Sequence, residues 1–432
     1  MVRFAQIIII VFSCAFISSC SKDKDDVKPT VVVHSPVYLQ QINGMDTVQI
    51  LATISDNRNI EWVKVSLRNN NDIPVLSTIT KKPNTADYEL NVMYFFDDIH
   101  LASGQYYFDI SASDGENITT KYVDIVLNET PKIRNGIFVF SNTGSQTDIS
   151  LLANNFNASF YNSLSGDYLD AAVNSYDQQL IHTSSIVGSI SSIDLKSGGL
   201  AWNVPINSSP PTPYYMGFLY DNQHIYLGKR NGIIQGYDNN GAANYGATAY
   251  PNYYLESALV HEDYYLVTEQ HLISGSAVKL VLYWMASGME VKQLNLNEDV
   301  KGMYSYSANE IILITNDASS MGKLDFYTIP SGLSSSPFTI GVGYIDDCVE
   351  ISNGVFLVAS GGDILLINAN NFSTTPFLSG IGANKLNYDY LTNELFVTSG
   401  NTLTIYDYTS KVLKGNYVHS NTILNVAFWY NK

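Results

Sequence analysis

The chain has 432 residues, which is long enough for two or three domains and a large core. It holds 31 Tyr and 18 Phe, charged residues make up only 15% of it, and long runs of helix-forming residues are missing. This composition favours short strands bounded by turns, and therefore an all-β fold. The formal net charge of -17 argues against a nucleic-acid partner, because phosphate binding needs a clustered basic surface.

The amino-terminal segment has the pattern of an export signal. Arg3 precedes an apolar run, IIIIVF at residues 7–12, which begins a core of roughly a dozen residues and is short for a membrane-spanning helix. The segment Phe16-Ile17-Ser18-Ser19-Cys20 resembles the lipobox of bacterial lipoproteins. The resemblance implies a signal peptide over residues 1–19 and lipidation at Cys20, with acyl chains that hold the protein on a membrane. An ordinary signal peptide with an incidental Cys is the alternative.

Residues 20–28 form an expected acidic tether. Ser21 after the Cys resembles outer-membrane sorting, and the cluster KDKDD at residues 22–26 resembles the surface-export signal of Bacteroidetes-type lipoproteins. A solvated spacer is the other interpretation, and both can hold. We expect a lipid-anchored, surface-exposed outer-membrane protein, with a periplasm-facing protein as the alternative. Cys348 is the only cysteine outside residues 1–20, so no intramolecular disulfide is expected.

Residues 29–130 read as a first domain of about seven strands. Trp62–Leu67 alternates apolar and polar side chains, which is typical of a half-buried strand. The stretch Gly104–Asn117 resembles the closing hairpin of bacterial immunoglobulin-like modules, which implies an immunoglobulin-like β-sandwich that acts as a spacer or docking surface. The predicted strands are Thr30–His34, Asp46–Ile54, Glu61–Leu67, Ile73–Thr80, Tyr88–Tyr94, Gly104–Ser113 and Thr119–Leu127.

Three carboxylates near that hairpin raise the question of a calcium site. Asp109, Asp114 and Glu116 are scattered along the chain and do not have the spacing of a coordination loop. We therefore interpret them as turn-forming and solvated residues, and we predict no metal ion.

Residues 131–135 form a short linker, and a repeat of 39 to 46 residues fills residues 136–432. This is the period of a four-stranded propeller blade. Seven units fit best, with six or eight blades as the alternatives. The expected last positions of the third strand are Leu152, Asp194, Asp238, Trp284, Thr328, Asn368 and Asp407.

The first unit lacks its innermost strand, because Gly136–Phe140 already reads as a second strand. Ile423–Tyr430 reads as a first strand with no blade after it. Pairing these two segments completes a blade and closes the ring, which removes open sheet edges. The sequence therefore predicts a seven-bladed β-propeller closed by its C-terminal strand.

Two segments resemble known propeller repeats. Ile193–Trp202 is similar to the quinoprotein-type repeat, with Ser197 in place of Thr. The other segment resembles the YVTN repeat at Leu395, Phe396, Val397, Asn401, Thr402, Thr404 and Asp407. These resemblances imply the scaffold alone, so no quinone and no other cofactor is expected.

Candidate ligand-binding residues lie on the predicted innermost strands, which converge at the channel mouth. They are Asp170, Tyr215, Glu256, Lys301, Asp346, Asp347 and Lys385. A polar ring that binds a ligand is the functional interpretation, and a water-filled channel with internal ion pairs is the structural one. Neighbouring residues of a strand point to opposite sides, which argues against Asp346 and Asp347 as a catalytic pair.

Catalytic motifs are missing from the sequence: it has no G-x-S-x-G elbow, P-loop or dinucleotide fingerprint. His261-Glu262-Asp263 reads as a solvated surface turn. We expect a non-catalytic surface protein whose propeller binds a protein or a glycan. The alternatives are a propeller hydrolase or lyase acting on a polysaccharide, and a structural subunit of an outer-membrane complex.

Overall fold

The computed structural model describes residues 25–432, apart from residues 145, 187–188, 207–211, 297 and 341–342. The expected signal peptide, residues 1–19, and the expected lipidation residue Cys20 therefore lie outside the described residues. The chain divides into a first unit that ends at Pro131 and a second unit from Lys132 to Lys432. The regular elements in the described part are all strands, and no helix there is long and apolar enough to cross a membrane.

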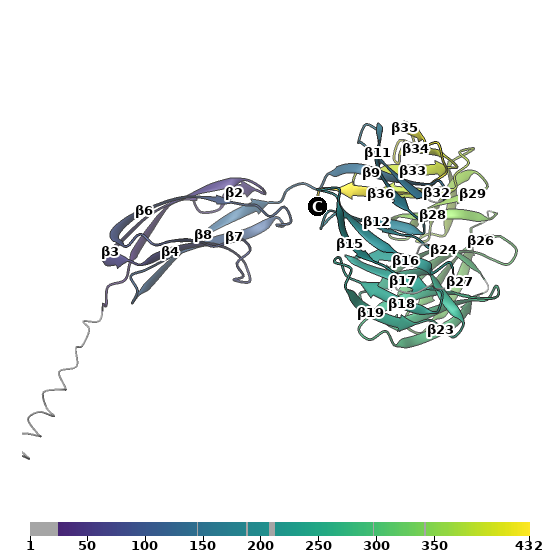
Figure 1. The fold of residues 1–432 in the computed structure, drawn as a ribbon, viewed down its shortest axis with the longest axis horizontal. Helices are drawn as coiled ribbons and strands as arrows, with labels where there is room; N and C mark the ends of the chain where they lie inside the picture. The colour runs from purple at the N-terminus through teal and green to yellow at the C-terminus, as the bar shows by residue number, and fades with distance from the viewer. Residues whose placement is uncertain (1–24, 145, 187–188, 207–211, 297, 341–342) are drawn as a thin grey trace, which may run out of the picture. The chain divides into compact units, whose positions relative to one another are not determined.

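The first unit is a sandwich of two sheets (Figure 1). The three-stranded sheet has the order β1 (Thr30–Ser35), β3 (Thr47–Ile60), β6 (Thr85–Phe95). The five-stranded sheet has the order β2 (Gln40–Asn43), β8 (Ile118–Asn128), β7 (Gly104–Ser113), β4 (Trp62–Asn69), β5 (Ile79–Lys81). The orders β1-β3-β6 and β8-β7-β4 match the A-B-E and G-F-C orders of the immunoglobulin fold. The predicted sandwich is therefore confirmed.

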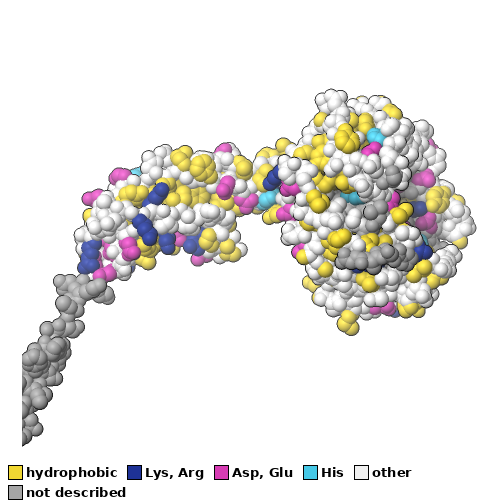
Figure 2. Space-filling view, in the orientation of Figure 1, with side chains coloured by type: hydrophobic (Ala, Val, Ile, Leu, Met, Phe, Trp, Pro, Cys, Tyr) yellow, Lys and Arg dark blue, Asp and Glu magenta, His cyan; other side chains and the backbone are white. Residues whose placement is uncertain are grey.

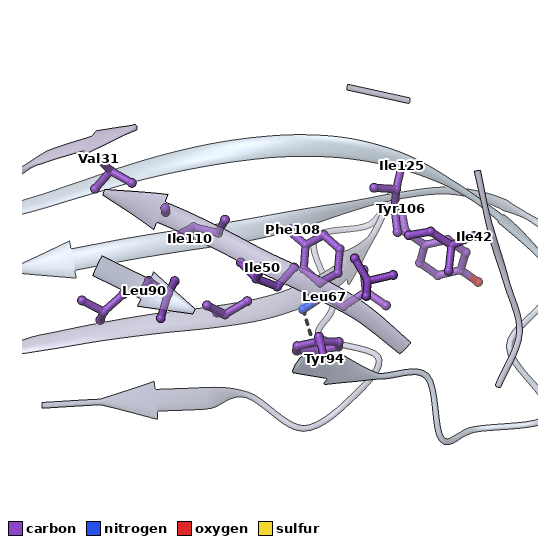
Figure 3. Packing of buried hydrophobic residues seen from close by; sticks show 14 of the residues in the cluster. Val31, Ile42, Ile50, Leu67, Leu90, Tyr94, Tyr106, Phe108, Ile110 and Ile125 are labelled. Carbon is purple, nitrogen blue, oxygen red and sulfur yellow. Dashed lines mark hydrogen bonds between the residues drawn. The ribbon is translucent and has the colours of Figure 1, made fainter. Parts of the chain in front are cut away.

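Both sheets contribute to one hydrophobic core. Figure 3 shows Ile50 of β3, Leu67 of β4 and Phe108 of β7 pointing into the shared interior. Tyr94 of β6 is also buried there, and its hydroxyl accepts a hydrogen bond from the Leu67 amide at 3.3 Å and donates one to the Ser77 carbonyl at 3.0 Å. The only polar end of this ring is thus satisfied, as a buried hydroxyl requires.

Two details of the first unit differ from the prediction. The expected strand Ile73–Thr80 is wrong for most of its length, since β5 covers only Ile79–Lys81 and residue 74 is a proline that forms an isolated bridge with Arg68. Proline has no amide hydrogen to donate to a ladder, which explains the interruption. The short polar strand β2 has no apolar alternation, so its sequence gave no signal; it pairs with β8 in parallel.

The second unit consists of seven four-stranded antiparallel sheets, which are the blades of a β-propeller. The innermost strands, which approach one another around the ring, are β36 (Ile423–Tyr430), β12 (Asp170–Asn174), β16 (Tyr215–Asp221), β20 (Tyr253–His261), β24 (Asp299–Ser307), β28 (Ile345–Ser352) and β32 (Lys385–Asp389). The second strands are β9 (Arg134–Asn142), β13 (Gln179–Thr183), β17 (His224–Lys229), β21 (Tyr265–Leu272), β25 (Glu310–Asn316), β29 (Val355–Ser360) and β33 (Glu394–Ser399).

The third strands are β10 (Gln146–Leu152), β14 (Ile190–Asp194), β18 (Ile233–Tyr237), β22 (Val278–Trp284), β26 (Gly322–Thr328), β30 (Asp363–Asn368) and β34 (Thr402–Asp407). The outermost strands are β11 (Ala158–Ser165), β15 (Leu200–Val204), β19 (Ala243–Thr248), β23 (Glu290–Leu296), β27 (Leu333–Thr339), β31 (Ser373–Leu378) and β35 (Leu413–Val418). Every predicted end of a third strand coincides with an observed end except Asp238, which follows β18 directly. The count of seven blades is confirmed.

The C-terminal strand closes the ring as predicted. In Figure 1, β36 lies beside β9, and the two pair antiparallel from Ile423 opposite Ser141 to Tyr430 opposite Arg134. Strand β9 begins at Arg134, two residues before the predicted start of the propeller. We number the blades in chain order, from blade 1, which contains β9 to β11 and β36, to blade 7, which contains β32 to β35. Phe396 of blade 7 packs against Phe428 of β36, so the closing strand is held by side chains as well as by its ladder.

A buried ion pair network reinforces this closure. The Arg134 guanidinium Nη1 lies 2.8 Å from Asp389 Oδ2 and 2.6 Å from Glu394 Oε2, and all three residues are at most 5% exposed. The Tyr430 hydroxyl of β36 donates to Asp389 Oδ1 at 2.8 Å. The network therefore joins the first strand, the last strand and blade 7.

Candidate binding face at the channel mouth

Antiparallel pairing places three kinds of strand end on one surface of the propeller. Where an innermost strand begins, the second strand of the same blade ends and the third begins. We call this surface the entry face. Its loops join each blade to the next and each second strand to its third, so side chains from all seven blades meet around the channel mouth.

All seven predicted site residues lie at or near the starts of innermost strands, and six of them have exposed or partly exposed side chains. Lys301, Asp346, Asp347 and Lys385 lie within the first three residues of their strands, as does Asp170. Glu256 is the fourth residue of β20. These side chains are exposed or partly exposed, although burial raises the pKa of Asp170, Asp347 and Glu256. Neighbouring protein atoms displace water around each carboxyl group even where part of the side chain reaches solvent.

Asp170 and Asp347 share a positive neighbour. Burial raises the pKa of both carboxyl groups, and the Lys385 ammonium opposes the rise at each of them. Asp170 Oδ1 accepts hydrogen bonds from Asn425 Nδ2 at 3.1 Å and from the Tyr168 hydroxyl at 3.2 Å. This part of the ring has the internal pairing that a polar channel wall needs.

Asp346 and Asp347 diverge, as the alternation of a strand requires. Asp347 Oδ2 accepts the backbone amide of Leu386 in the next blade at 2.7 Å. Asp346 is exposed and lines a depression of about 460 Å³ together with Tyr344, Ser360 and Asp363. One carboxylate therefore holds two blades together, while the other faces solvent.

Tyr215 is the first residue of its strand, β16, but its side chain is buried, unlike those of the other six predicted site residues. It is 2% exposed and lies in a core cluster with Ile181, Leu227 and Tyr237. Its ring packs edge-on against Tyr214 with the centroids 4.7 Å apart. The aromatic side chain fills the space between blades, so the expectation that it reaches a ligand at the mouth is wrong.

Sequence reasoning missed a group formed by Asp299, Lys301 and Tyr344. Lys301 Nζ lies 2.9 Å from Asp299 Oδ2 and 4.9 Å from the centre of the Tyr344 ring. The Tyr344 hydroxyl donates to the same Asp299 oxygen at 3.0 Å. Burial raises the pKa of Asp299, but the hydrogen bonds from Lys301 and Tyr344 outweigh burial, so the net shift is downward.

A second missed group lies beside it on blade 4. His271 Nε2 lies 2.7 Å from Glu269 Oε1, and Ser257 Oγ donates to Glu269 Oε2 at 2.6 Å. The hydrogen bond with Glu269 raises the pKa of His271, burial opposes it, and the charges of Glu269, Glu256 and Asp299 add to the rise. In the sequence, β21 is an apolar run, Tyr265–Val267, followed by four polar residues, a pattern that does not mark a site.

Two depressions flank the Tyr344–Asp299 hydrogen bond. Tyr344 lines the depression of about 460 Å³ that contains Asp346, and Asp299 lines another of about 340 Å³ that contains His271 and Asn316. Both depressions are open, and each combines polar groups with an aromatic or aliphatic wall. Such a surface can hold an extended ligand by stacking and hydrogen bonds.

Other positions are structural. His261, which the sequence places in a solvated turn, is 0% exposed; its Nδ1 lies 3.0 Å from Ser305 Oγ and its Nε2 3.3 Å from the Ala308 carbonyl. The expectation for His261 is therefore wrong, and its role is to join blades 4 and 5.

In the view of Figure 2, acidic and basic side chains are scattered among uncharged ones on the second unit.

Comparisons with known proteins describe the second unit only in outline. No family model and no curated protein matches the chain. The chain is similar to the Cps50 (Swd1) β-propeller domain of Myceliophteria thermophila, with 12% identity, a TM-score of 0.44, and coverage of 61% of this chain and 87% of that one. It is also similar to the Pan2 WD40 domain of Neurospora crassa, with 12% identity, a TM-score of 0.45, and coverage of 61% and 79%. The β-propeller itself is defined by the seven four-stranded sheets.

Proposed function

We propose that this protein is a non-catalytic binding protein whose propeller recognises a protein or a glycan at the entry face. The observation that carries the proposal is the group Asp299, Lys301 and Tyr344, which lies between two open depressions. Its hydrogen bonds and cation–π contact fix the tyrosine ring before any ligand arrives. A preorganised aromatic surface loses little side-chain entropy on binding, which favours affinity.

The arrangement of charges supports binding over hydrolysis. A glycoside hydrolase needs two carboxyl groups on either side of one bond, about 5 to 9.5 Å apart. Asp346 faces an open depression that Asp363 also lines, but Asp363 Oδ1 accepts the Gly380 amide at 2.8 Å and Asp347 accepts the Leu386 amide. Two further mouth carboxylates, Asp170 and Asp299, accept two or more hydrogen bonds each or pair with lysine, which suits a fixed polar wall.

The proposed location is the outer membrane, with Cys20 lipidated and the folded units facing outward. This part rests on the lipobox-like segment at residues 16–20 and on the acidic residues that follow. In cells that express the full chain, replacement Cys20→Ala should move the protein from the outer-membrane fraction to the soluble fraction. Protease added to intact cells should degrade the wild-type protein; an untouched protein in that assay would contradict surface exposure.

The binding proposal is tested by capture experiments with the full-length protein in detergent. Solubilised envelope proteins and a glycan array are each presented to it, and bound material is identified. A reproducible protein or glycan partner is expected in one of the two. Cleavage of an array polysaccharide would favour a hydrolase or lyase, and a stoichiometric complex isolated directly from membranes would favour a structural subunit; the absence of any partner would contradict the proposal.

A further inference from the structure

Three carboxylates of the first unit meet although they are far apart in the sequence. Asp25 precedes β1, Asp56 lies in β3, and Asp114 lies in the turn between β7 and β8. One carboxylate oxygen of each lies within 4.8 Å of the other two. Two oxygens that bind the same calcium ion at about 2.4 Å can be at most about 4.8 Å apart, so this spacing fits a single ion.

Asp56 provides a second and independent observation. Both of its carboxylate oxygens are buried and have no hydrogen-bond partner of normal geometry. Burial raises the pKa of Asp56; the amide of Asn57 opposes the rise, and the charges of Asp114 and Asp25 add to it. Carboxylate oxygens that are buried without a well-formed hydrogen bond are costly, so a cation bound to them would lower the free energy of the folded state.

The cluster carries more negative than positive charge. Arg58 Nε lies 2.9 Å from Asp25 Oδ2, and Arg58 Nη1 lies 2.9 Å from Glu116 Oε1. Asp25, Asp56, Asp114 and Glu116 are four carboxylates, and Arg58 is a single guanidinium among them. Asp114 Oδ1 accepts the amide of Glu116 at 2.7 Å, which fixes the carboxylate in the turn.

The chain around Asp25 is held firmly enough to keep the carboxylates in place. The Asp25 amide donates to Glu116 Oε2 at 2.8 Å. Asn117 Nδ2 donates to the backbone carbonyl oxygens of Asp25 at 2.8 Å and Val27 at 3.0 Å. The carboxylate of Asp25 is 3% exposed. The cluster is thus a preformed pocket of oxygen atoms and not a set of mobile surface side chains.

We propose that Asp25, Asp56 and Asp114 bind a calcium ion that fastens the segment before β1 to the β7–β8 turn. All the donors are oxygens, which suits a hard cation. Calcium accepts irregular coordination by six to eight oxygens, whereas magnesium requires a near-ideal octahedron. In the full chain the ion would fix the point at which the acidic tether enters the folded unit.

The test uses the full-length protein stripped of metal with EDTA and then dialysed. Titration calorimetry with calcium chloride should give one site with a dissociation constant of roughly 0.1 to 1 mM, the range of extracellular calcium modules. Hydrogen exchange of peptides that cover residues 25–30 and 113–118 should slow when calcium is added. Asp56→Asn should weaken binding at least about tenfold, because it removes a charged ligand and keeps the side-chain shape. The matched control is Asp87→Asn, an exposed aspartate of the same unit, which should bind as wild type does.

Measurements of stability with and without calcium separate calcium binding by Asp56 from a purely structural role of this side chain. Asp56→Asn removes repulsion among buried carboxylates, so in EDTA the variant should be at least as stable as wild type, and only calcium should make wild type the more stable protein. Three results would overturn the proposal: no calcium-dependent heat or protection in wild type up to 10-fold above roughly 1 mM, an unchanged affinity in Asp56→Asn, or an equal effect from sodium chloride at matched ionic strength.

Discussion

Arg134 is the residue on which the closure of the ring depends most. Its guanidinium neutralises Asp389 and Glu394 in a place where none of the three is more than 5% exposed. The network of Arg134, Asp389 and Glu394 as a whole adds little net stability over an apolar replacement, since burying charges has its own cost. Removal of the guanidinium alone leaves the fully buried Asp389 without its cation, which is the expensive state, whereas Glu394 keeps its ion pair with Lys414.

We therefore predict that Arg134→Ala lowers the free energy of unfolding of the propeller by about 3–5 kcal/mol. Urea denaturation followed by circular dichroism measures the change. The control is Lys196→Ala, an exposed lysine in a turn, which should change stability by less than about 0.5 kcal/mol. Equal, small effects of the two replacements would show that the network does not hold the ring closed.

Because the pKa of His271 is raised in the folded protein, we predict that stability depends on pH. Its hydrogen bond with Glu269 raises the pKa of the imidazole above the ordinary value of 6.5, against the effect of burial. Because the folded pKa is the higher one, the stabilisation is fully present below about pH 6.5 and is lost as the pH rises through the folded pKa. His271→Gln should therefore destabilise the propeller more at pH 6 than at pH 9.

Denaturation of wild type and variant at the two pH values gives the comparison. Glu269→Gln should abolish the same difference, because it removes the anionic partner of the imidazole. If the wild-type advantage over His271→Gln is the same at both pH values, the protonated pair is not a source of stability.

At the scale of elements, blades 3 and 4 depend on glycines where they approach most closely. A Cβ on Gly217 of β16 would lie 2.5 Å from the Glu256 carbonyl oxygen and 2.5 Å from Leu255 Cδ2, both in β20. Backbone atoms cannot move aside as a flexible side chain can. The innermost strands therefore come together here only because this position has no side chain.

Gly217→Val should separate these blades and destabilise the propeller by roughly 1–3 kcal/mol or more. The matched control is Gly246→Val in β19 of the same blade, where a Cβ would meet no atom within 4 Å. Thermal unfolding compares the two. A Gly217→Val protein as stable as the Gly246→Val protein would contradict the close packing of β16 on β20.

The repeat made most of the propeller predictable from the sequence. Each blade ends its third strand with a turn, so a period fitted to residues such as Asp194, Trp284 and Asp407 located every blade to within one residue. Prediction failed where local sequence has no pattern or misleads. β2 is short and polar, and Pro74 interrupts an apparently strand-like segment.

At the scale of the whole molecule, the entry face exists only because the seven blades close into a ring. The starts of innermost strands were predictable as a channel mouth because any propeller brings them together. The exposure of each side chain was not, since it depends on which neighbouring blade the strand faces: Tyr215 is buried between blades, whereas Asp346 is exposed. Tyr344 and Asp299, on successive blades, and Asp25 and Asp56 in the first unit, meet only through the tertiary fold.

The central claim is that the entry face is the binding surface. Its most direct test is quantitative capture, from envelope protein and on a glycan array, by wild type, Tyr344→Ala and Tyr264→Ala. Tyr264 is 67% exposed in the turn between β20 and β21, at the opposite end of the strands from Tyr344. Tyr344→Ala should weaken binding at least about tenfold, about 1.4 kcal/mol, and Tyr264→Ala should bind as wild type does. Unchanged binding by Tyr344→Ala together with weakened binding by Tyr264→Ala would contradict it.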